Sequence, residues 1–217
     1  MEILNYGLLS VSVQPSGIGN GGSLILETPN LRVTDGGQIL AGTSGRGHAG
    51  NLTIYASDEL EVLGDNASVA TIVNWGAEGN AGNLNLNTAR LRLSDGGQIS
   101  VSTRGQGNAG NLTVNVAESV EISGMSSNGI TVSNLSASVD RMAVGDGGNL
   151  TVETDRLTLR DRAEIDVSSF GQGSAGNLTI NADSILLENS AFGAVTFFGD
   201  RGNITLDAND LVLRRGS

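Results

Sequence analysis

The chain contains no cysteine and only 2 prolines and 1 histidine among its 217 residues. Without cysteine there is neither a disulfide framework nor thiol chemistry, and this composition is compatible with export without requiring it. No apolar run approaches the roughly 18 residues that a membrane-spanning helix needs, so we expect no membrane insertion. Residues 1–20 lack a basic region, a continuous apolar stretch and a small-residue cleavage site. We therefore expect no signal peptide in this chain.

Basic residues are scarce, because 12 arginines and lysines face 23 acidic residues and leave a net charge of −11. An acidic surface repels nucleic acids and anionic membranes, so neither is expected as a partner. Glycine is abundant at 32 residues, roughly twice the usual share of about 7%. Since 38% of the residues are also hydrophobic, this composition indicates many tight turns between short strands and not disorder.

A short motif, Asn-Leu or a close equivalent, returns throughout the sequence. Its intervals are 28 residues on three occasions and 32, 38 and 26 residues on the others. A fixed unit that alternates with a variable one is the signature of a solenoid. We therefore expect residues 1–217 to form one repeat domain. Its coils, meaning single turns of the solenoid, should start near residues 23, 51, 83, 111, 149, 177 and 203.

Apolar residues within a unit occur in pairs separated by one position, which is the period of a strand with one buried face. Three such pairs imply three short strands per coil. Identical positions stack only if each coil lies in register on the previous one, so the pattern predicts an all-β, right-handed parallel β-helix of about seven coils. Longer units take up their extra residues after the second strand. In the unit that starts at Asn83, the pairs are Leu84 and Leu86, Leu91 and Leu93, and Ile99 and Val101.

The first residue of each unit can form a second stacked row. Asparagine amides at equivalent positions can bond to one another along the axis, and we favour this structural ladder over a binding role. The predicted ladder consists of Asn51, Asn83, Asn111, Asn149, Asn177 and Asn203. The Asp-Gly-Gly corners at residues 35–37 and 95–97 are interpreted as turns, in which glycine takes positive φ.

Several stretches between Ala81 and Val114, echoed over residues 17–206, carry a family resemblance. They are Gly-Asn-Ala-Gly-Asn-Leu-Thr, Leu-Arg-Leu-Ser-Asp-Gly-Gly-Gln-Ile and Ser-Thr-Arg-Gly-Gln-Gly. The pattern resembles the passenger repeats of two-partner-secretion exoproteins, the filamentous-haemagglutinin-like adhesins, particularly cyanobacterial ones. The resemblance implies a right-handed β-helix, export through an outer-membrane transporter, and attachment to glycans or proteins of a host, neighbouring cell or matrix. It also implies a secreted or outer-surface location within a longer precursor.

The two ends of the sequence suggest a piece of a longer rod. Leu211 and Leu213 complete a second strand, and no third strand follows them. Because open solenoid ends leave strand edges and core unpaired, we expect a fragment whose exposed coils could associate end to end.

Candidate chemical residues are few. His48 lies in a glycine-rich return loop and is interpreted as a surface residue and not as a catalyst or metal ligand. Asp146-Gly147-Gly148 is interpreted as a turn and not as a calcium site, because neither the calcium-binding nonapeptide nor an EF-hand loop is present. Two acidic groups are interpreted as alternating positions on solvated strands; they are Asp58, Glu59 and Glu61, and Asp161, Glu164 and Asp166. No catalytic residue, cofactor or metal site is therefore predicted.

Three aromatic residues lie in the variable stretches after the second strand. Trp75, Phe197 and Phe198 could stack on sugar rings, although we favour core filling at an irregular third side. The most plausible function is a non-catalytic structural and adhesive segment of a filamentous-haemagglutinin-like exoprotein. The alternatives are a carbohydrate-binding or polysaccharide-degrading β-helix and, less favoured, the stalk of a contact-dependent toxin exoprotein.

Overall fold

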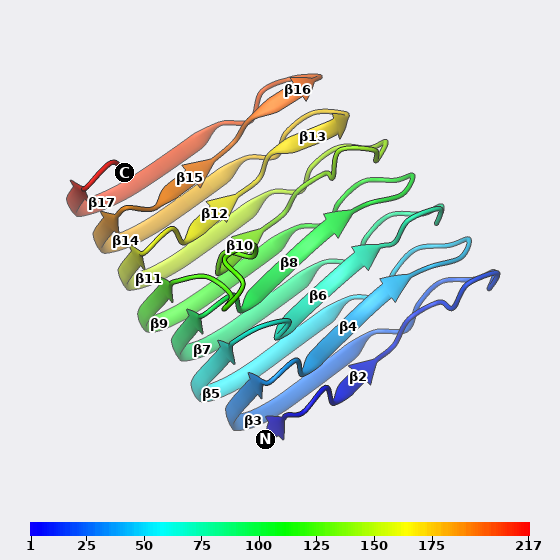
Figure 1. The fold of residues 1–217 in the computed structure, drawn as a ribbon, viewed down its shortest axis with the longest axis horizontal. Coiled ribbons are helices and arrows are strands. Elements are labelled where there is room, and N and C mark those ends of the chain that lie inside the picture. The colour runs from blue at the N-terminus through cyan, green and yellow to red at the C-terminus, as the bar shows by residue number, and fades with distance from the viewer.

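The protein, described here over residues 1–217 by a computed structural model, is all-β. Each coil adds one strand to a long sheet and one strand to a second sheet that lies against it (Figure 1). The long sheet has 8 strands and the second sheet has 7, as expected for about seven coils. The predicted parallel β-helix is thus confirmed. No helix that could cross a membrane is present.

The strands alternate between the two sheets along the chain. The long sheet contains β1 (Glu2–Ile3), β3 (Leu24–Thr34), β5 (Leu52–Leu63), β7 (Leu84–Ser94), β9 (Leu112–Ser123), β11 (Leu150–Arg160), β14 (Leu178–Glu188) and β17 (Ile204–Arg214). The second sheet contains β2 (Leu8–Ser10), β4 (Gln38–Thr43), β6 (Ser68–Val73), β8 (Gln98–Thr103), β10 (Asn134–Ser136), β12 (Glu164–Asp166) and β15 (Ala191–Gly193). A short pair is formed by β13 (Ser169–Gln172) and β16 (Thr196–Phe198).

Neighbouring strands are parallel, and equivalent residues of successive coils pair along the solenoid. Leu112 pairs with Leu84 of the preceding coil and with Leu150 of the following one. In the second sheet, Leu135 likewise lies between Ile99 and Ile165. Most inward side chains therefore rest on an apolar residue at the same position of the next coil, although Val73 lies between the buried Thr43 and Thr103.

The first two strands expected in each coil are one continuous strand, and a bulge lies near its middle where the longer β5 and β9 meet their neighbours. In β7 the register shifts between Thr88 and Arg90, where one extra residue of the neighbouring strand is accommodated. The Thr88 hydroxyl donates a hydrogen bond to the Arg90 carbonyl at 3.1 Å, which satisfies a backbone group freed by the bulge. The expected three short strands are therefore a bent long strand and a shorter one.

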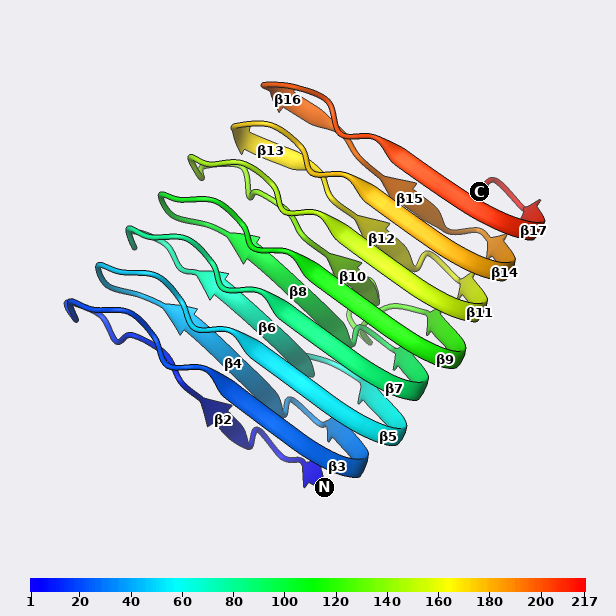
Figure 2. The same cartoon turned by 180° about the vertical axis from the view of Figure 1, so that it is seen from behind.

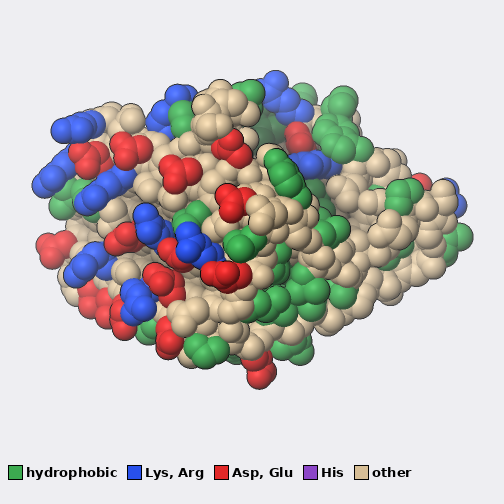
Figure 3. All heavy atoms as spheres, turned by 60° about the horizontal axis from the view of Figure 1, so that its bottom comes forward, with side chains coloured by type: hydrophobic (Ala, Val, Ile, Leu, Met, Phe, Trp, Pro, Cys, Tyr) green, Lys and Arg blue, Asp and Glu red, His purple; other side chains and the backbone are tan.

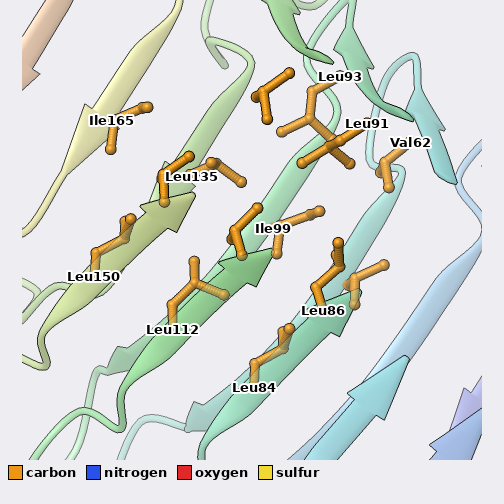
Figure 4. Close-up of a cluster of buried hydrophobic side chains, with 14 of the residues drawn as sticks. Val62, Leu84, Leu86, Leu91, Leu93, Ile99, Leu112, Leu135, Leu150 and Ile165 are labelled. Atoms are coloured by element: carbon orange, nitrogen blue, oxygen red, sulfur yellow. The ribbon is translucent and has the colours of Figure 1, made fainter. Parts of the chain in front are cut away.

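The core fills the space between the two sheets as a single cluster of 40 buried residues. Its leucine, isoleucine and valine side chains converge from both sheets in Figure 4, where Leu84 and Leu112 lie near Leu86 and Ile99. Both Leu86 and Ile99 are fully buried. Each such side chain contributes about 1.5–3 kcal/mol by leaving water, so the stacked rows supply most of the drive to fold.

Charged side chains gather on the outer face of the long sheet. Glu61 lies between Arg32 and Arg92 of the adjacent coils, at 3.5 Å and 3.7 Å respectively. Glu59 and Glu118 flank Arg90 in the same way. Figure 3 shows these two kinds of charge interspersed on one side of the molecule. Exposed pairs of this kind contribute about 0–1 kcal/mol each, so their main effect is on which coils pair.

The glycine-rich returns form a thin arm that extends beyond the second-sheet strands (Figure 2). Their backbones pair in parallel from coil to coil, as Arg46 with Glu78 and Glu78 with Gln106. Gly107 has a φ of +135°, and a Cβ there would collide with the carbonyl group of Gly79. Glycine is therefore required where the arm's backbones come into contact.

The longest unit takes up its extra residues between β9 and β10, after the long strand as expected. Residues 124–133 form a loop closed by an antiparallel bridge between Met125 and Val132. The Ser127 N–H donates to Asp65 Oδ1 at 2.7 Å, and the Ser127 hydroxyl bonds the same carboxylate. These bonds lower the pKa of Asp65 below its ordinary value. The loop thus reaches back across the sheet to an earlier coil.

Replacing Leu112 with Asp should lower the free energy of unfolding by more than about 4 kcal/mol, because an unpaired charge would be buried between Leu84 and Leu150. The matched change Thr113→Asp places the same charge on the outward side of the strand and should cost within about 0.5 kcal/mol. Denaturant unfolding measures both values. Equal costs would contradict the inward assignment.

Candidate functional site

The unit-start asparagines form a continuous ladder, but its hydrogen bonds differ in kind from those expected. At each step the side-chain oxygen of one asparagine accepts the backbone N–H of the next; Asn83 and Asn111 both bind in this way at 2.9 Å. Bonds from amide to amide occur at the two steps from Asn149 to Asn177 and from Asn177 to Asn203, each at 3.1 Å. The row therefore secures the entry of each coil into the long sheet.

His48 belongs to a second ladder of the same kind, in the return arm. The His48 Nδ1 atom accepts the backbone N–H of Asn80 at 2.9 Å, and the backbone N–H of His48 donates to Asn20 Oδ1. Asp146 occupies the same row: its Oδ1 accepts the backbone N–H of Ser174, and its own backbone N–H donates to Asn108 Oδ1. Both residues thus hold coils together, and no group of three metal-ligating side chains exists in the structure.

The three aromatic residues singled out from the sequence are exposed, so the favoured interpretation as core filling is wrong. Trp75 is 53% exposed, Phe197 62% and Phe198 64%. The short segments that carry them leave the core to aliphatic residues of the two sheets. Trp75 follows β6, whereas the phenylalanines belong to β16, so the structure does not join them into one site. Phe197 instead contacts Phe170, with ring centroids 5.8 Å apart.

A polar hollow, called here the sheet groove, lies on the outer face of β8, β10 and β12. It encloses about 290 Å³. Strand register aligns Gln98, Asn134 and Glu164 in one row and Ser100, Ser136 and Asp166 in the next. Because side chains alternate along a strand, both rows point outward while Leu135 and Ile165 enter the core.

Two carboxylates at one end of the sheet groove have perturbed pKa values. Burial raises the pKa of Asp166, although hydrogen bonds from Ser168 oppose the shift. Burial and the nearby Asp166 charge raise the pKa of Glu164, and Arg162 opposes this. The Ser168 hydroxyl donates to Asp166 and accepts the Val195 N–H at 2.9 Å, so it fixes the carboxylate in place.

The other end of the sheet groove holds a cation and an aromatic ring. Arg104 pairs with Asp140 at 3.6 Å, and Phe170 completes the wall beside Phe197. Hydroxyls, amides and carboxylates with an adjacent ring can bind the hydroxyl groups and one face of a sugar. A carboxyl group with a raised pKa could also donate a proton.

The sequence groups Glu164 and Asp166 together but does not connect them with the other residues of the sheet groove. Glu164 and Asp166 were assigned to a solvated strand, which suits exposed Glu164 better than half-buried Asp166. Asn134, Ser136 and Phe170 were not singled out at all. These residues become neighbours only when β8, β10 and β12 lie side by side. Finding them from the sequence would have required aligning the units of variable length with one another. The acidic residues Glu59 and Glu61 belong instead to the ion pairs of the long sheet.

Comparison of the chain with protein-family models, curated proteins and solved structures finds no match.

The Asn ladder predicts a measurable cost for a surface change. Asn111→Ala removes the acceptor of the Asn149 N–H and should lower the free energy of unfolding by about 1 kcal/mol. Asn85→Ala, at an exposed position of β7 with no side-chain hydrogen bond, is the control and should be nearly neutral. A comparable loss in both variants would show that the ladder contributes nothing.

Asp166→Asn should stabilise the protein more at about pH 7 than at about pH 4. The raised folded-state pKa means that the folded chain binds more protons than the unfolded chain between the two pKa values. Stability is therefore lost as the pH rises through that window, and the uncharged variant avoids the loss. Denaturant midpoints at both pH values measure the difference, with exposed Asp155→Asn as the control. A gain independent of pH would contradict the assignment.

Proposed function

We propose that this chain is a non-catalytic structural and adhesive segment of a secreted or surface-exposed exoprotein of the filamentous-haemagglutinin-like kind. The supporting observation is the continuous parallel pairing from β3 to β17, in which each coil repeats the previous one. A solenoid of this kind extends by about 4.8 Å for each coil, so repetition provides reach. Export through an outer-membrane transporter partner belongs to this proposal by resemblance of the repeats.

Adhesive contacts in this proposal come from the exposed side chains that the repeat does not need for folding. Trp75, Phe197 and Phe198 are apolar side chains that remain in water. The sheet groove adds hydroxyl, amide and carboxylate groups beside the Phe170 and Phe197 rings. Such surfaces suit many weak contacts with glycans or proteins of another cell or matrix, which add up along a rod.

An antibody against residues 1–217 should detect the native protein at the outer surface or in the culture medium of fractionated source cells. Beads coated with the purified chain should also bind those cells, and beads coated with the Phe197→Ala, Phe198→Ala double variant should bind fewer of them. Beads coated with albumin are the control for nonspecific adsorption. Detection only in the cytoplasm, together with no bead binding, would refute the proposal.

A polysaccharide-degrading enzyme is the second candidate, favoured by one observation. Glu164 and Asp166 lie two positions apart on the same face of β12, and both have raised pKa values. One carboxyl group held protonated beside an ionised one is the arrangement of many glycosidases.

Release of reducing ends from neutral and acidic polysaccharides tests the second candidate. The enzyme hypothesis predicts release by the natural chain and a loss of at least about 100-fold in Glu164→Gln or Asp166→Asn. The adhesive proposal predicts no release by any of the three proteins. Activity that both substitutions abolish would reverse the order of the two candidates.

A further inference from the structure

A second hollow, called here the axial groove, crosses the long strands near their middle, where the pairing between neighbouring strands has a gap. A threonine hydroxyl at this point bonds the carbonyl two residues on, as Thr28 does to Asn30 at 3.0 Å. Thr88 and Thr154 repeat this contact in later coils. Because these mid-strand positions stack from coil to coil, they line up in an open, shallow groove parallel to the solenoid axis.

The axial groove consists of three adjoining cavities of about 570, 470 and 300 Å³. The first two share Asn87, Thr88 and Ala117, and the second and third share Thr154. The groove therefore runs from Glu27 on β3 to Asp207 on β17, across every complete strand of the long sheet.

One wall of the axial groove presents a hydrogen-bonding side chain from every coil. The row starts at Glu27 and Tyr55, continues through Asn87 and Asn115, and ends at Asn181 and Asp207. The Asn115 amide donates to Asn87 Oδ1 at 3.1 Å, which holds two members of the row in place. Polar groups thus recur at the coil spacing of about 4.8 Å.

We infer that the axial groove binds a linear polysaccharide without acidic groups, laid along the solenoid with about one sugar for each coil. A pyranose unit in an extended polysaccharide is similar in length to the coil spacing. An extended peptide advances only about 3.3 Å per residue and falls out of step with the coils after a few residues. The periodicity of the wall therefore favours a sugar chain over a peptide.

The charges of the axial groove favour the same class of ligand. Its charged lining residues are all carboxylates, namely Glu27, Glu153, Asp155, Asp183 and Asp207. They repel polyuronates and sulfated glycans but accept hydrogen bonds from sugar hydroxyls. Tyr55, 47% exposed, and Pro29 offer apolar surface for the face of a sugar ring.

The axial groove lies on the long sheet, whereas the sheet groove lies on the second sheet. Sugar binding in the axial groove goes beyond the proposed adhesive role. The inference can fail while the adhesive proposal stands, because adhesion through Phe197 and Phe198 involves other strands.

Titration calorimetry of the intact chain with cello-, manno-, xylo- and chito-oligosaccharides, from disaccharide to heptasaccharide, tests the inference. Because each coil adds a subsite, the affinity for at least one series should rise at least about tenfold with length. The acidic counterpart, an oligogalacturonate series, should bind at least about tenfold more weakly. Failure of all four series, an affinity independent of length, or equal binding of oligogalacturonate would overturn the inference.

Ala117→Trp locates the binding. Ala117 is exposed and lies where the first two cavities meet, so a bulky side chain there should divide the groove and abolish the gain in affinity with length. Ala191→Trp, at an exposed alanine on β15, is the matched control and should bind like the natural chain. Thermal unfolding of both variants establishes that the fold is retained.

Asp166→Asn separates the two grooves. Loss of oligosaccharide binding in this variant, with full binding by Ala117→Trp, would place the sugar in the sheet groove and overturn the inference. Oligosaccharide binding that depends on Ala117, combined with cytoplasmic detection of the native protein and no adhesion of coated beads, would uphold the axial groove and reject the adhesive proposal alone.

Discussion

Backbone pairing between successive coils is the constraint on which the rest of this structure depends. Parallel strands satisfy their N–H and C=O groups only by lying in register on the coils before and after them. Leu112 consequently rests between Leu84 and Leu150, and a slip of one residue would turn every inward aliphatic side chain of that strand toward solvent. Apolar burial and backbone pairing thus select the same arrangement, which is why the core is one unbroken cluster.

The same register stacks the outward side chains, and there the chemistry of each row decides what the stacking does. Asparagine oxygens accept backbone N–H groups of the next coil, so they add stability at the coil entry. Charged rows add specificity, because Arg32, Glu61 and Arg92 alternate in sign from coil to coil. Skipping one coil would bring the two arginines together, so the alternation opposes that mispairing.

Both grooves arise where the repeat departs from a flat sheet. The axial groove follows the gap in pairing that the long strands share near their middle, whereas the sheet groove depends on residues particular to β8, β10 and β12. Asp166 is kept in a partly buried position there although burial disfavours its charge, and groups held against their solvation preference are concentrated at functional sites. The axial groove is thus suited to contacts that repeat from coil to coil, and the sheet groove to a single local contact.

The sequence by itself determined the parallel β-helix, the coil starts and the inward positions, because a repeat that pairs with its own copies turns local periodicity into tertiary contacts. Leu84, Leu91 and Ile99 could be assigned to the core from spacing alone. Tertiary structure decided the rest. The fusion of two expected strands through a bulge, the exposure of Phe197 and the meeting of Asn134 with Asp166 in one groove depend on distances between coils and on the path of variable segments. Those features are set by packing between residues far apart in the sequence, for which no local pattern carries a signal.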